Sequence, residues 1–383
     1  MTRAMRVALI DPSLFTLPYD AALAAGLQTE GHTVVLHGRN PGPDDNATEG
    51  VPLQASFYRV AGAPIFARLP RALRLGLKGL DHAWSMEALV RRLRREAPDI
   101  IHFQWLPLPV VDRRFLNRLR RIAPLVLTVH DTNPFNNNPT GALQRVGAQA
   151  AFRDFDRLIV HTEQGRARLL AYGEGMDRVA VMPHGLLGHA PAAVAADPMQ
   201  GEITFLLFGK IKPYKGTDLL IEAFACMDPA LRAQARLRIV GKPYTDIEPL
   251  HHLAQRLGVT DRVVIEPHFV RDEEVSDIFV PGVVATFPYR EIEASGVLSL
   301  AIAFGRPILA TRLGGFIEAV QDGEHGLLVP PEDVTALSAA MARFVGERNF
   351  AAACAAKVRT LTASVPTWPE IAHQTAELYA SLI

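Results

Sequence analysis

Apolar runs of three to five residues alternate with helix-like stretches along the first half of the chain. Residues 7–10 predict a strand, residues 21–30 a helix that ends at Gly31, and residues 33–36 a second strand. Three further apolar runs follow, at 100–103, 125–129 and 158–160. Brief apolar strands separated by helices are typical of a parallel, doubly wound sheet. The predicted fold class is therefore α/β.

The same rhythm begins again in the second half of the chain. Its predicted strands lie at 204–208, 237–240, 263–265, 283–287, 307–310 and 326–329. Its predicted helices begin near Thr217, Ile247, Glu273, Gly296 and Val334. Residues 188–201, GHAPAAVAADPMQG, separate the two halves and have no apolar period, which is typical of an interdomain linker.

These patterns predict two doubly wound domains, residues 1–190 and 200–365. Parallel sheets of this kind bind ligands outside the carboxyl ends of their strands, so we expect the chemistry in loops that face a cleft between the domains. Residues 369–383 have an amphipathic helical pattern after a proline-containing break. The segment 366–383 is therefore predicted to cross back and pack on the first domain.

Charge and cysteine content narrow the classes of function. The chain carries 40 Lys and Arg against 40 Asp and Glu, so no global basic surface favours nucleic acid as a partner. Cys226 and Cys354 stand in alanine-rich surroundings, and we predict that both are core residues. Two cysteines are too few for a disulfide framework or a metal cluster. The opening apolar run is too short for a signal peptide, and we predict a cytoplasmic location.

The strongest local motif is FLLFGKIKPYKGTDLLIEAF, residues 205–224. A buried strand ends at Gly209, and a helix is predicted to begin near Gly216, with Thr217 as its N-cap. Unpaired amides of a helix N-terminus, together with Lys210 and Lys215, favour binding of an anion such as a diphosphate. A solvated basic turn between strand and helix explains the same residues.

A second motif covers residues 287–329. Its acidic loop, with Glu291 and Glu293, leads to Ser295 and Gly296 at another predicted helix start, where Ser295 can cap the helix. Further along, the turn 314–315 precedes Glu318. Carboxylates beside a cationic phosphate site would suit sugar hydroxyls, whereas an ordinary loop with solvated glutamates is the alternative.

With these two motifs the chain resembles the retaining glycosyltransferases of family 4, which have the GT-B fold of two Rossmann-like domains. The resemblance covers nearly the whole chain, strongly over 181–329 and weakly before residue 125. In that family a strand followed by Gly-Lys and later Lys-Gly supplies cations to the donor diphosphate. The matching residues here are Gly209, Lys210, Lys215 and Gly216.

The resemblance also implies where the donor sugar lies. The family pairs two glutamates eight positions apart, but Ser299 and Ala301 stand eight after Glu291 and Glu293, so the ribose-binding carboxylate is missing or replaced. Ser295, Gly296 and Val297 carry over as diphosphate contacts. Either Glu291 or Glu293 is the acid that faces the sugar. The remaining donor-binding residues by analogy are Gly241, His268 and Glu318.

In the first half, LVLTVHDTNPF places His130 at the carboxyl end of a strand, where similar enzymes hold a histidine at the reaction centre. The alternative is a purely structural role, in which His130 caps a loop. His161 and His184 resemble residues that position loops in this family. The family's glycine pair after the first strand is absent from residues 13–20, so that loop must be shaped differently.

The activity implied is retaining transfer of a hexose from a nucleotide-diphosphate sugar to a glycan, lipid-linked or small-molecule acceptor, in polysaccharide or glycoconjugate biosynthesis. Fixed cations such as Lys210 and Lys215 can stabilise the departing phosphate without a metal. No zinc-type spacing of His and Cys occurs, and we expect neither a cofactor nor a tightly bound metal.

Residues 66–121 carry thirteen Lys or Arg against five Asp or Glu, interleaved with apolar residues. This composition suits an interfacial helix at an anionic membrane or a lipid-diphosphate acceptor. A solvated basic helix with an apolar stripe facing the core fits equally well.

Two other functions stay open at this point. A nucleotide-sugar epimerase would have two similar domains and a diphosphate site, but it would need acid and base carboxylates beside the sugar and no acceptor. The missing second glutamate also leaves room for a partner subunit that binds a nucleotide sugar without catalysis.

Overall fold

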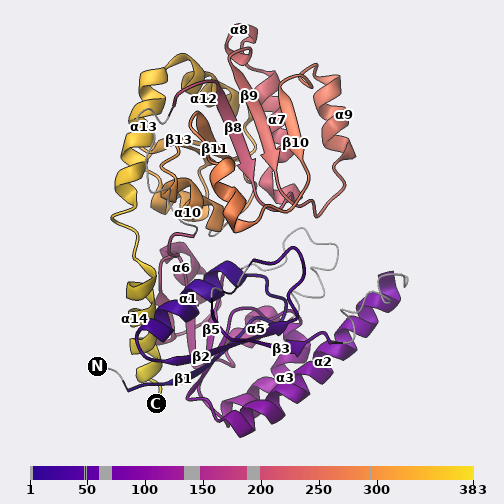
Figure 1. Cartoon of the computed structure of the whole chain (residues 1–383), viewed down its shortest axis with the longest axis vertical. Helices are drawn as coiled ribbons and strands as arrows, with labels where there is room; N and C mark the ends of the chain where they lie inside the picture. Colours follow the sequence, from indigo (N-terminus) through magenta and orange to yellow (C-terminus); the bar gives the residue numbers. More distant parts are fainter. Residues whose placement is uncertain are drawn as a thin grey trace. The chain divides into compact units, whose positions relative to one another are not determined.

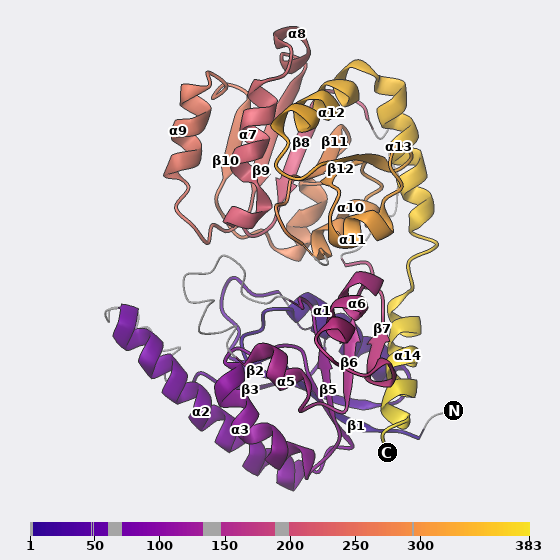
Figure 2. The ribbon, with the colours of Figure 1, turned by 180° about the vertical axis from the view of Figure 1, so that it is seen from behind.

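The computed structural model describes residues 3–46, 48, 50–59, 71–132, 147–187, 199–292 and 295–383. The chain divides into two compact units (Figures 1 and 2). The first comprises residues 1–185 and 366–383, and the second comprises residues 186–365. Most of the predicted linker, 188–198, lies outside the described residues.

The first unit is built on a parallel sheet of seven strands in the order β3-β2-β1-β4-β5-β6-β7. The strands are β1 (Arg6–Ile10), β2 (Thr33–Arg39), β3 (Leu53–Phe57), β4 (Ile100–Phe103), β5 (Leu125–Thr128), β6 (Arg157–Val160) and β7 (Val179–Val181). The helices are α1 (Leu17–Thr29), α2 (Arg71–Glu96), α3 (Pro109–Arg120), α5 (Ala148–Phe152), α6 (Glu163–Ala171) and α14 (Trp368–Ala380).

Both faces of this sheet are buried, which explains why its strands read as apolar runs without alternation. In β1, Val7 and Leu9 belong to one apolar core, and Ala8 and Ile10 belong to another on the opposite face. The strand at β3 was not predicted from the sequence. Its residues LQASF mix polar and apolar side chains because β3 is an edge strand that pairs only with β2.

The second unit has a parallel six-stranded sheet in the order β10-β9-β8-β11-β12-β13. The strands are β8 (Ile203–Phe208), β9 (Ala235–Val240), β10 (Val263–Glu266), β11 (Val283–Phe287), β12 (Ile308–Thr311) and β13 (Gly326–Val329). The α-helices are α7 (Thr217–Ala225), α8 (Pro229–Arg232), α9 (Glu248–Arg256), α10 (Gly296–Ala303), α11 (Gly314–Ala319), α12 (Val334–Gly346) and α13 (Arg348–Leu361).

Each strand order reverses direction once, between β1 and β4 in the first sheet and between β8 and β11 in the second. Loops that leave neighbouring strands on the two sides of such a switch point diverge and leave a crevice at the carboxyl ends. The switch points therefore mark where a ligand site is expected in each unit.

Helix α14 follows the second unit in sequence but belongs to the first unit, where it packs beside α1 (Figure 1). Its side chains Ile371, Ala372 and Tyr379 are buried in the core that also contains Leu23 of α1. A side chain at Gly26 would place its Cβ 2.8 Å from the Cβ of Ala372. Glycine at this position allows the close approach of the two helices.

A buried acid pair shapes the loop after β1. The Asp11 carboxylate accepts from the backbone amides of Ser13 (3.1 Å) and Thr16 (2.9 Å), and the Thr16 hydroxyl lies 3.2 Å from Asp20 Oδ1. Leu14 has a φ of 52°, a left-handed conformation that such bonds can hold. These bonds give the loop its fold in the absence of glycine.

Asp11 and Asp20 are fully buried, and burial raises the pKa of both, with Asp20 raised further by the neighbouring Asp11. The folded state then holds a proton that the unfolded chain releases above pH 3.8, so the free energy of unfolding falls as pH rises. We predict that Asp20→Asn matches the wild type in stability at pH 4 and is more stable than the wild type at pH 8. Urea unfolding at both pH values measures this difference, and an equal pH dependence would contradict it.

Two sequence expectations about the second unit are wrong. Cys226 is exposed, since it caps the carboxyl end of α7, whereas Cys354 is buried as predicted. The segment predicted as a helix near Glu273 is only a short 3₁₀ helix, Asp272–Asp277, at whose start the Arg271 backbone amide donates to the Glu274 carboxylate (2.8 Å).

Candidate active site

Predicted diphosphate residues of the second unit lie at the switch point of its sheet. Gly209 and Lys210 directly follow β8, and Tyr289 and Arg290 follow the neighbouring strand β11. Lys215 ends a 3₁₀ turn (Pro213–Lys215) that leads into α7. The loops with the predicted cations are therefore at the place where parallel sheets of this kind bind ligands.

Glycines allow these loops to approach one another. Gly209 has a φ of +95°, and a Cβ there would lie 3.0 Å from Lys215 Nζ and 3.2 Å from Val297 Cγ2. At Gly241, which follows β9, a Cβ would lie 2.1 Å from the carbonyl oxygen of Gly209. The structure thus brings together Gly209, Lys215, Gly241 and Val297, which stand far apart in the sequence.

Lys215 is a buried cation. Its side chain is 4% exposed, donates to the Phe208 carbonyl (3.0 Å) and lies with Nζ 5.3 Å from the centre of the Tyr289 ring. Within the described part of the chain it forms no ion pair with a carboxylate. Burial, followed by the charges of Lys210 and Lys212, lowers the pKa of Lys215 to about 7. A bound anion would favour its charged form.

Two more lysines surround this position. The ammonium groups of Lys210 and Lys212 lie 5.9 and 5.4 Å from the centre of the Tyr244 ring, which is 55% exposed. The repulsion they exert on Lys215 shows that the three positive charges converge. A polyvalent anion would relieve this repulsion and gain from all three.

Arg290 clamps the loop that carries Lys215. Its guanidinium donates to both oxygens of Asp218 (2.9 and 2.8 Å) and to the Pro213 carbonyl (2.9 Å), while its backbone amide donates to the Tyr214 carbonyl (2.7 Å). Sequence reasoning missed this pair, because the two residues are 72 positions apart. The one available signal was that Arg290 lies within the second motif, residues 287–329.

Of the two predicted helix caps, Thr217 is wrong and Ser295 is right in position only. Helix α7 has Gly216 as its N-cap, so Thr217 is already in the first turn, where its hydroxyl is buried without a partner among the described residues. Ser295 does stand at the N-cap of α10, but its side chain makes no capping bond and instead hydrogen-bonds to Tyr289. Gly296 is the first residue of α10.

The other predicted donor residues lie in the loops and helices that follow β10, β11 and β12. Glu291 is half-buried in the loop before α10, and Glu293 lies outside the described residues. Ser299 and Ala301 are buried within α10, so neither position offers a carboxylate. His268 and Glu318 are exposed, after β10 and in α11 respectively.

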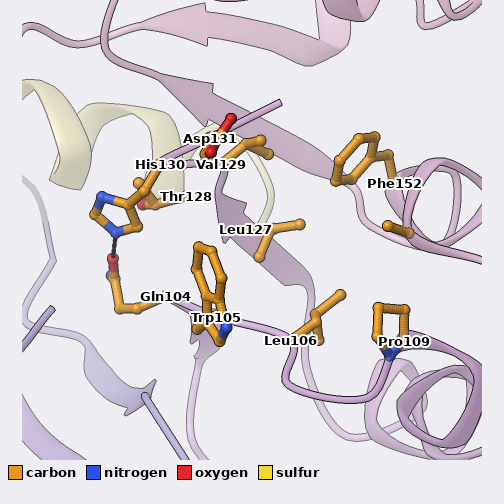
Figure 3. A pocket seen from close by; sticks show the side chains of 11 residues that line it. Gln104, Trp105, Leu106, Pro109, Leu127, Thr128, Val129, His130, Asp131 and Phe152 are labelled. Atoms are coloured by element: carbon orange, nitrogen blue, oxygen red, sulfur yellow. Dashed lines mark hydrogen bonds between the residues drawn. The ribbon is translucent and has the colours of Figure 1, made fainter. Parts of the chain in front are cut away.

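His130 lies in the first unit, two residues after β5. Its Nε2 is 3.1 Å from Gln104 Oε1 (Figure 3), and its Nδ1 is 3.0 Å from His161 Nε2. Beside it, a mainly apolar pocket lies at the carboxyl ends of β4 and β5. The pocket is lined by Gln104, Trp105, Leu106, Pro109, Leu127, Thr128, Val129, His130, Asp131, Ala148 and Phe152.

His130 belongs to a cluster of three histidines that pack against the ring of Tyr19. Tyr19 packs its ring against His130, His161 and His184, with centroid distances of 4.9, 5.2 and 5.2 Å. Burial is the main cause that lowers the pKa of each histidine, to about 3 for His161 and well below the usual range for His130. Burial thus favours the neutral form of all three rings, and His161 and His184 each bond a backbone carbonyl.

In the described part of the chain, no group of three His, Cys, Asp or Glu side chains is arranged to hold a metal ion. One Asp-x-Asp sequence occurs, at residues 154–156. Its carboxylates bind arginines: Asp154 pairs with Arg113 at 2.5 Å, and Asp156 pairs with Arg120.

Comparison with known proteins agrees with this geometry. A family described as "Glycosyl transferase 4-like domain" matches residues 18–185, and one described as "Glycosyl transferases group 1" matches residues 202–347. The two matches correspond to the two units and together cover most of the chain. The chain belongs to the GT-B-fold glycosyltransferases of family 4.

Curated relatives match this chain at modest sequence identity and over part of their length. A D-inositol 3-phosphate glycosyltransferase of Acidothermus cellulolyticus is 31% identical over 246 residues, which cover 58% of this chain and 54% of that protein. The chain thus spans about half the length of this curated relative.

Solved structures share the fold over nearly the whole chain. HepE of Anabaena, crystallised with UDP and glucose, has a TM-score of 0.74 at 19% identity and covers 99% of this chain and 100% of its own. Sucrose-phosphate synthase of Thermosynechococcus elongatus has a TM-score of 0.76 at 20% identity, with 99% of each chain covered. These neighbours show the GT-B fold.

Proposed function

We propose that the protein transfers a hexose from a nucleotide-diphosphate sugar to a hydroxyl of a glycan, lipid-linked or small-molecule acceptor, with retention of anomeric configuration. The observation that carries this proposal is the buried Lys215 at the switch point, held beside Gly209 and Val297 and repelled by two further lysines. The Anabaena neighbour HepE was also crystallised with UDP-glucose, which supports a donor of this class.

The lysine cluster would act when the bond between the sugar and the diphosphate breaks. The electron pair of that bond moves to the β-phosphate, while the acceptor oxygen forms the new bond to the sugar carbon and its proton passes to the departing phosphate. Lys210 and Lys215 stabilise the developing charge, and amides at the starts of α7 and α10 can add to this effect. No cofactor or tightly bound metal takes part in this scheme.

The first unit is the acceptor-binding domain in this proposal, and the second binds the donor. The pocket beside His130 combines apolar walls from the loop after β4, from β5 and from α5 with polar groups at one end, as ligand sites commonly do. His130 would then contact a hydroxyl at the reaction centre. Glu291 or Glu293 would bind the sugar.

The test combines binding and turnover. Nucleotide sugars are first screened by thermal shift, since a bound donor raises the melting temperature, and binders are then assayed with an acceptor panel in the presence of a chelator. We expect a glycosylated product whose anomeric configuration, read by NMR, matches the donor. An epimerised donor without released nucleotide would favour the epimerase, and binding without turnover would favour a non-catalytic partner.

We also propose that the protein docks on an anionic membrane through α2, in keeping with a lipid-linked acceptor at the inner face. Leu73, Leu77, Leu80 and Trp84 stand at helical spacing on one side of this helix and are 38–72% exposed. Arg74 and Lys78 lie in the same two turns. No helix in the described part of the chain is long and apolar enough to cross a bilayer.

Leu80→Glu should reduce binding to vesicles that contain anionic lipid roughly tenfold, because one leucine buried in lipid contributes about 1.5 kcal/mol or more. Co-sedimentation measures the effect. Leu257→Glu, at an exposed leucine of the second unit, serves as the matched control and should bind like the wild type. Equal binding by both variants, or no binding by the wild type, would reject the membrane proposal.

A further inference from the structure

A series of hydrogen-bonded polar side chains, all buried except the half-buried His130, crosses the first unit from α14 to the end of β7. The Tyr379 hydroxyl lies 2.6 Å from His102 Nδ1, and Gln104 Nε2 lies 3.4 Å from His102 Nε2. Gln104 Oε1 lies 3.1 Å from His130 Nε2, and His130 Nδ1 lies 3.0 Å from His161 Nε2. Every link therefore joins groups within hydrogen-bond distance.

At one end of this series of hydrogen bonds, the donor and the acceptor are fixed. His161 Nδ1 lies 3.0 Å from the backbone carbonyl of Met182, which can only accept a hydrogen bond. His161 must therefore carry its proton on Nδ1. The ring is neutral, because burial lowers its pKa to about 3, so its Nε2 has a lone pair and accepts.

The assignment of His161 determines which nitrogen of His130 carries the proton. Since His161 Nε2 accepts, the group facing it, His130 Nδ1, must donate and carries the proton of that ring. His130 is neutral too, because burial and the neighbouring histidines lower its pKa. Its Nε2 is therefore the bare nitrogen, with a lone pair.

The remaining members can adapt to this direction. The Gln104 amide can be turned over, so that its N–H donates to His130 Nε2 and its oxygen accepts a hydrogen bond from the N–H at His102 Nε2. The Thr128 hydroxyl, 2.8 Å from His102 Nε2, can accept in the same arrangement. His102 Nδ1 then accepts from Tyr379, so that all the hydrogen bonds run one way, from α14 to Met182.

We propose that His161, held by the Met182 carbonyl, is a positioning residue that fixes His130 in the tautomer with a bare Nε2, and that Gln104 occupies this nitrogen until a substrate hydroxyl replaces it. This inference rests on the proposed function for the view that His130 meets substrate. In this tautomer His130 accepts a hydrogen bond from a sugar or acceptor hydroxyl. It does not serve as an acid toward the leaving group.

The tautomer can be observed without any assay. In protein labelled with ¹⁵N in its histidine rings, chemical shifts distinguish a protonated from a bare ring nitrogen, and the His130 signals are those absent from the spectrum of His130→Ala. We expect His130 at pH 7 to carry its proton on Nδ1. A proton on Nε2, or on both nitrogens, would overturn the inference.

Two variants separate positioning from mere packing. His161→Leu removes the acceptor, so His130 should become a mixture of tautomers. We expect kcat to fall about tenfold, a change that corresponds to the loss of about one hydrogen bond, and the KM for the donor to stay nearly unchanged. His161→Gln offers an amide oxygen to His130 Nδ1 and should restore both the single tautomer and most of kcat. An unchanged tautomer in His161→Leu would contradict the inference.

The outcomes also separate this inference from the proposed function. Sugar transfer by a protein whose His130 carries its proton on Nε2 would refute the inference alone. The predicted tautomer in a protein that binds none of the nucleotide sugars would support the inference and refute the proposed function.

Discussion

Lys215→Ala is expected to lower kcat by about 100- to 1,000-fold, the cost of removing one fixed group that stabilises charge in a transition state. Lys215 is the buried member of three converging lysines, and the anion it would stabilise is the departing diphosphate. Its burial gives the charge greater effect than it would have in water. Steady-state kinetics with the donor found in the screen measures the loss.

The same variant should remain folded. Folding buries an ammonium group whose lowered pKa shows that burial disfavours its charge, so removal of the charge does not weaken the fold at pH 6. Lys357→Ala, at a 60% exposed lysine beside Glu324, is the control and should leave both kcat and melting temperature unchanged. A folded Lys215→Ala protein with turnover near that of the wild type would refute the role of Lys215.

Gly216→Ala should destabilise the protein by about 1 to 3 kcal/mol more than Gly258→Ala. The two glycines have nearly equal φ values, +65° and +66°, so alanine meets the same backbone strain, about 1 to 2 kcal/mol, at both. At Gly258 no atom lies within 4 Å of the new Cβ, whereas at Gly216 the Pro288 carbonyl oxygen would be 2.0 Å away. Denaturant unfolding of the pair measures the difference.

Donor binding should follow the same order. The loop at Gly216 must shift away from Pro288 in the variant, and this shift moves Lys215, whereas Gly258 lies in a turn that ends α9. Gly258→Ala should therefore keep the wild-type affinity for the donor. Equal losses of stability or of affinity in the two variants would mean that the close approach at Gly216 has no special importance.

The sheets could be predicted from the sequence because burial on both faces makes each strand a short apolar run between helices. Strands β4, β11 and β13 agree with their predicted bounds at both ends. The edge strand β3 was missed, because its mixed residues have no such signal. The lysine motif could be placed because strand, Gly-Lys and Lys-Gly are neighbours in sequence.

Other features depend on contacts between distant positions. The clamp of Arg290 on Asp218 joins residues 72 positions apart, and the bond from His102 to Tyr379 joins residues 277 apart. Local patterns do not show such pairs. The predicted cap at Thr217 was wrong, and Ser295 stands at its N-cap without a capping bond, because capping preferences do not reveal that Gly216 adopts a left-handed conformation or that Tyr289 binds Ser295.

The central claim, that a buried lysine of the second unit grips a diphosphate, is tested most directly by titrating a nucleoside diphosphate into the protein between pH 7.5 and 9. Over this range the phosphates are already ionised, while Lys215, with a pKa of about 7, is losing its proton. The wild-type affinity should fall by about tenfold for each pH unit, and the affinity of Lys215→Met should be weak and nearly independent of pH. Equal affinities and equal pH dependences in the two proteins would contradict the claim.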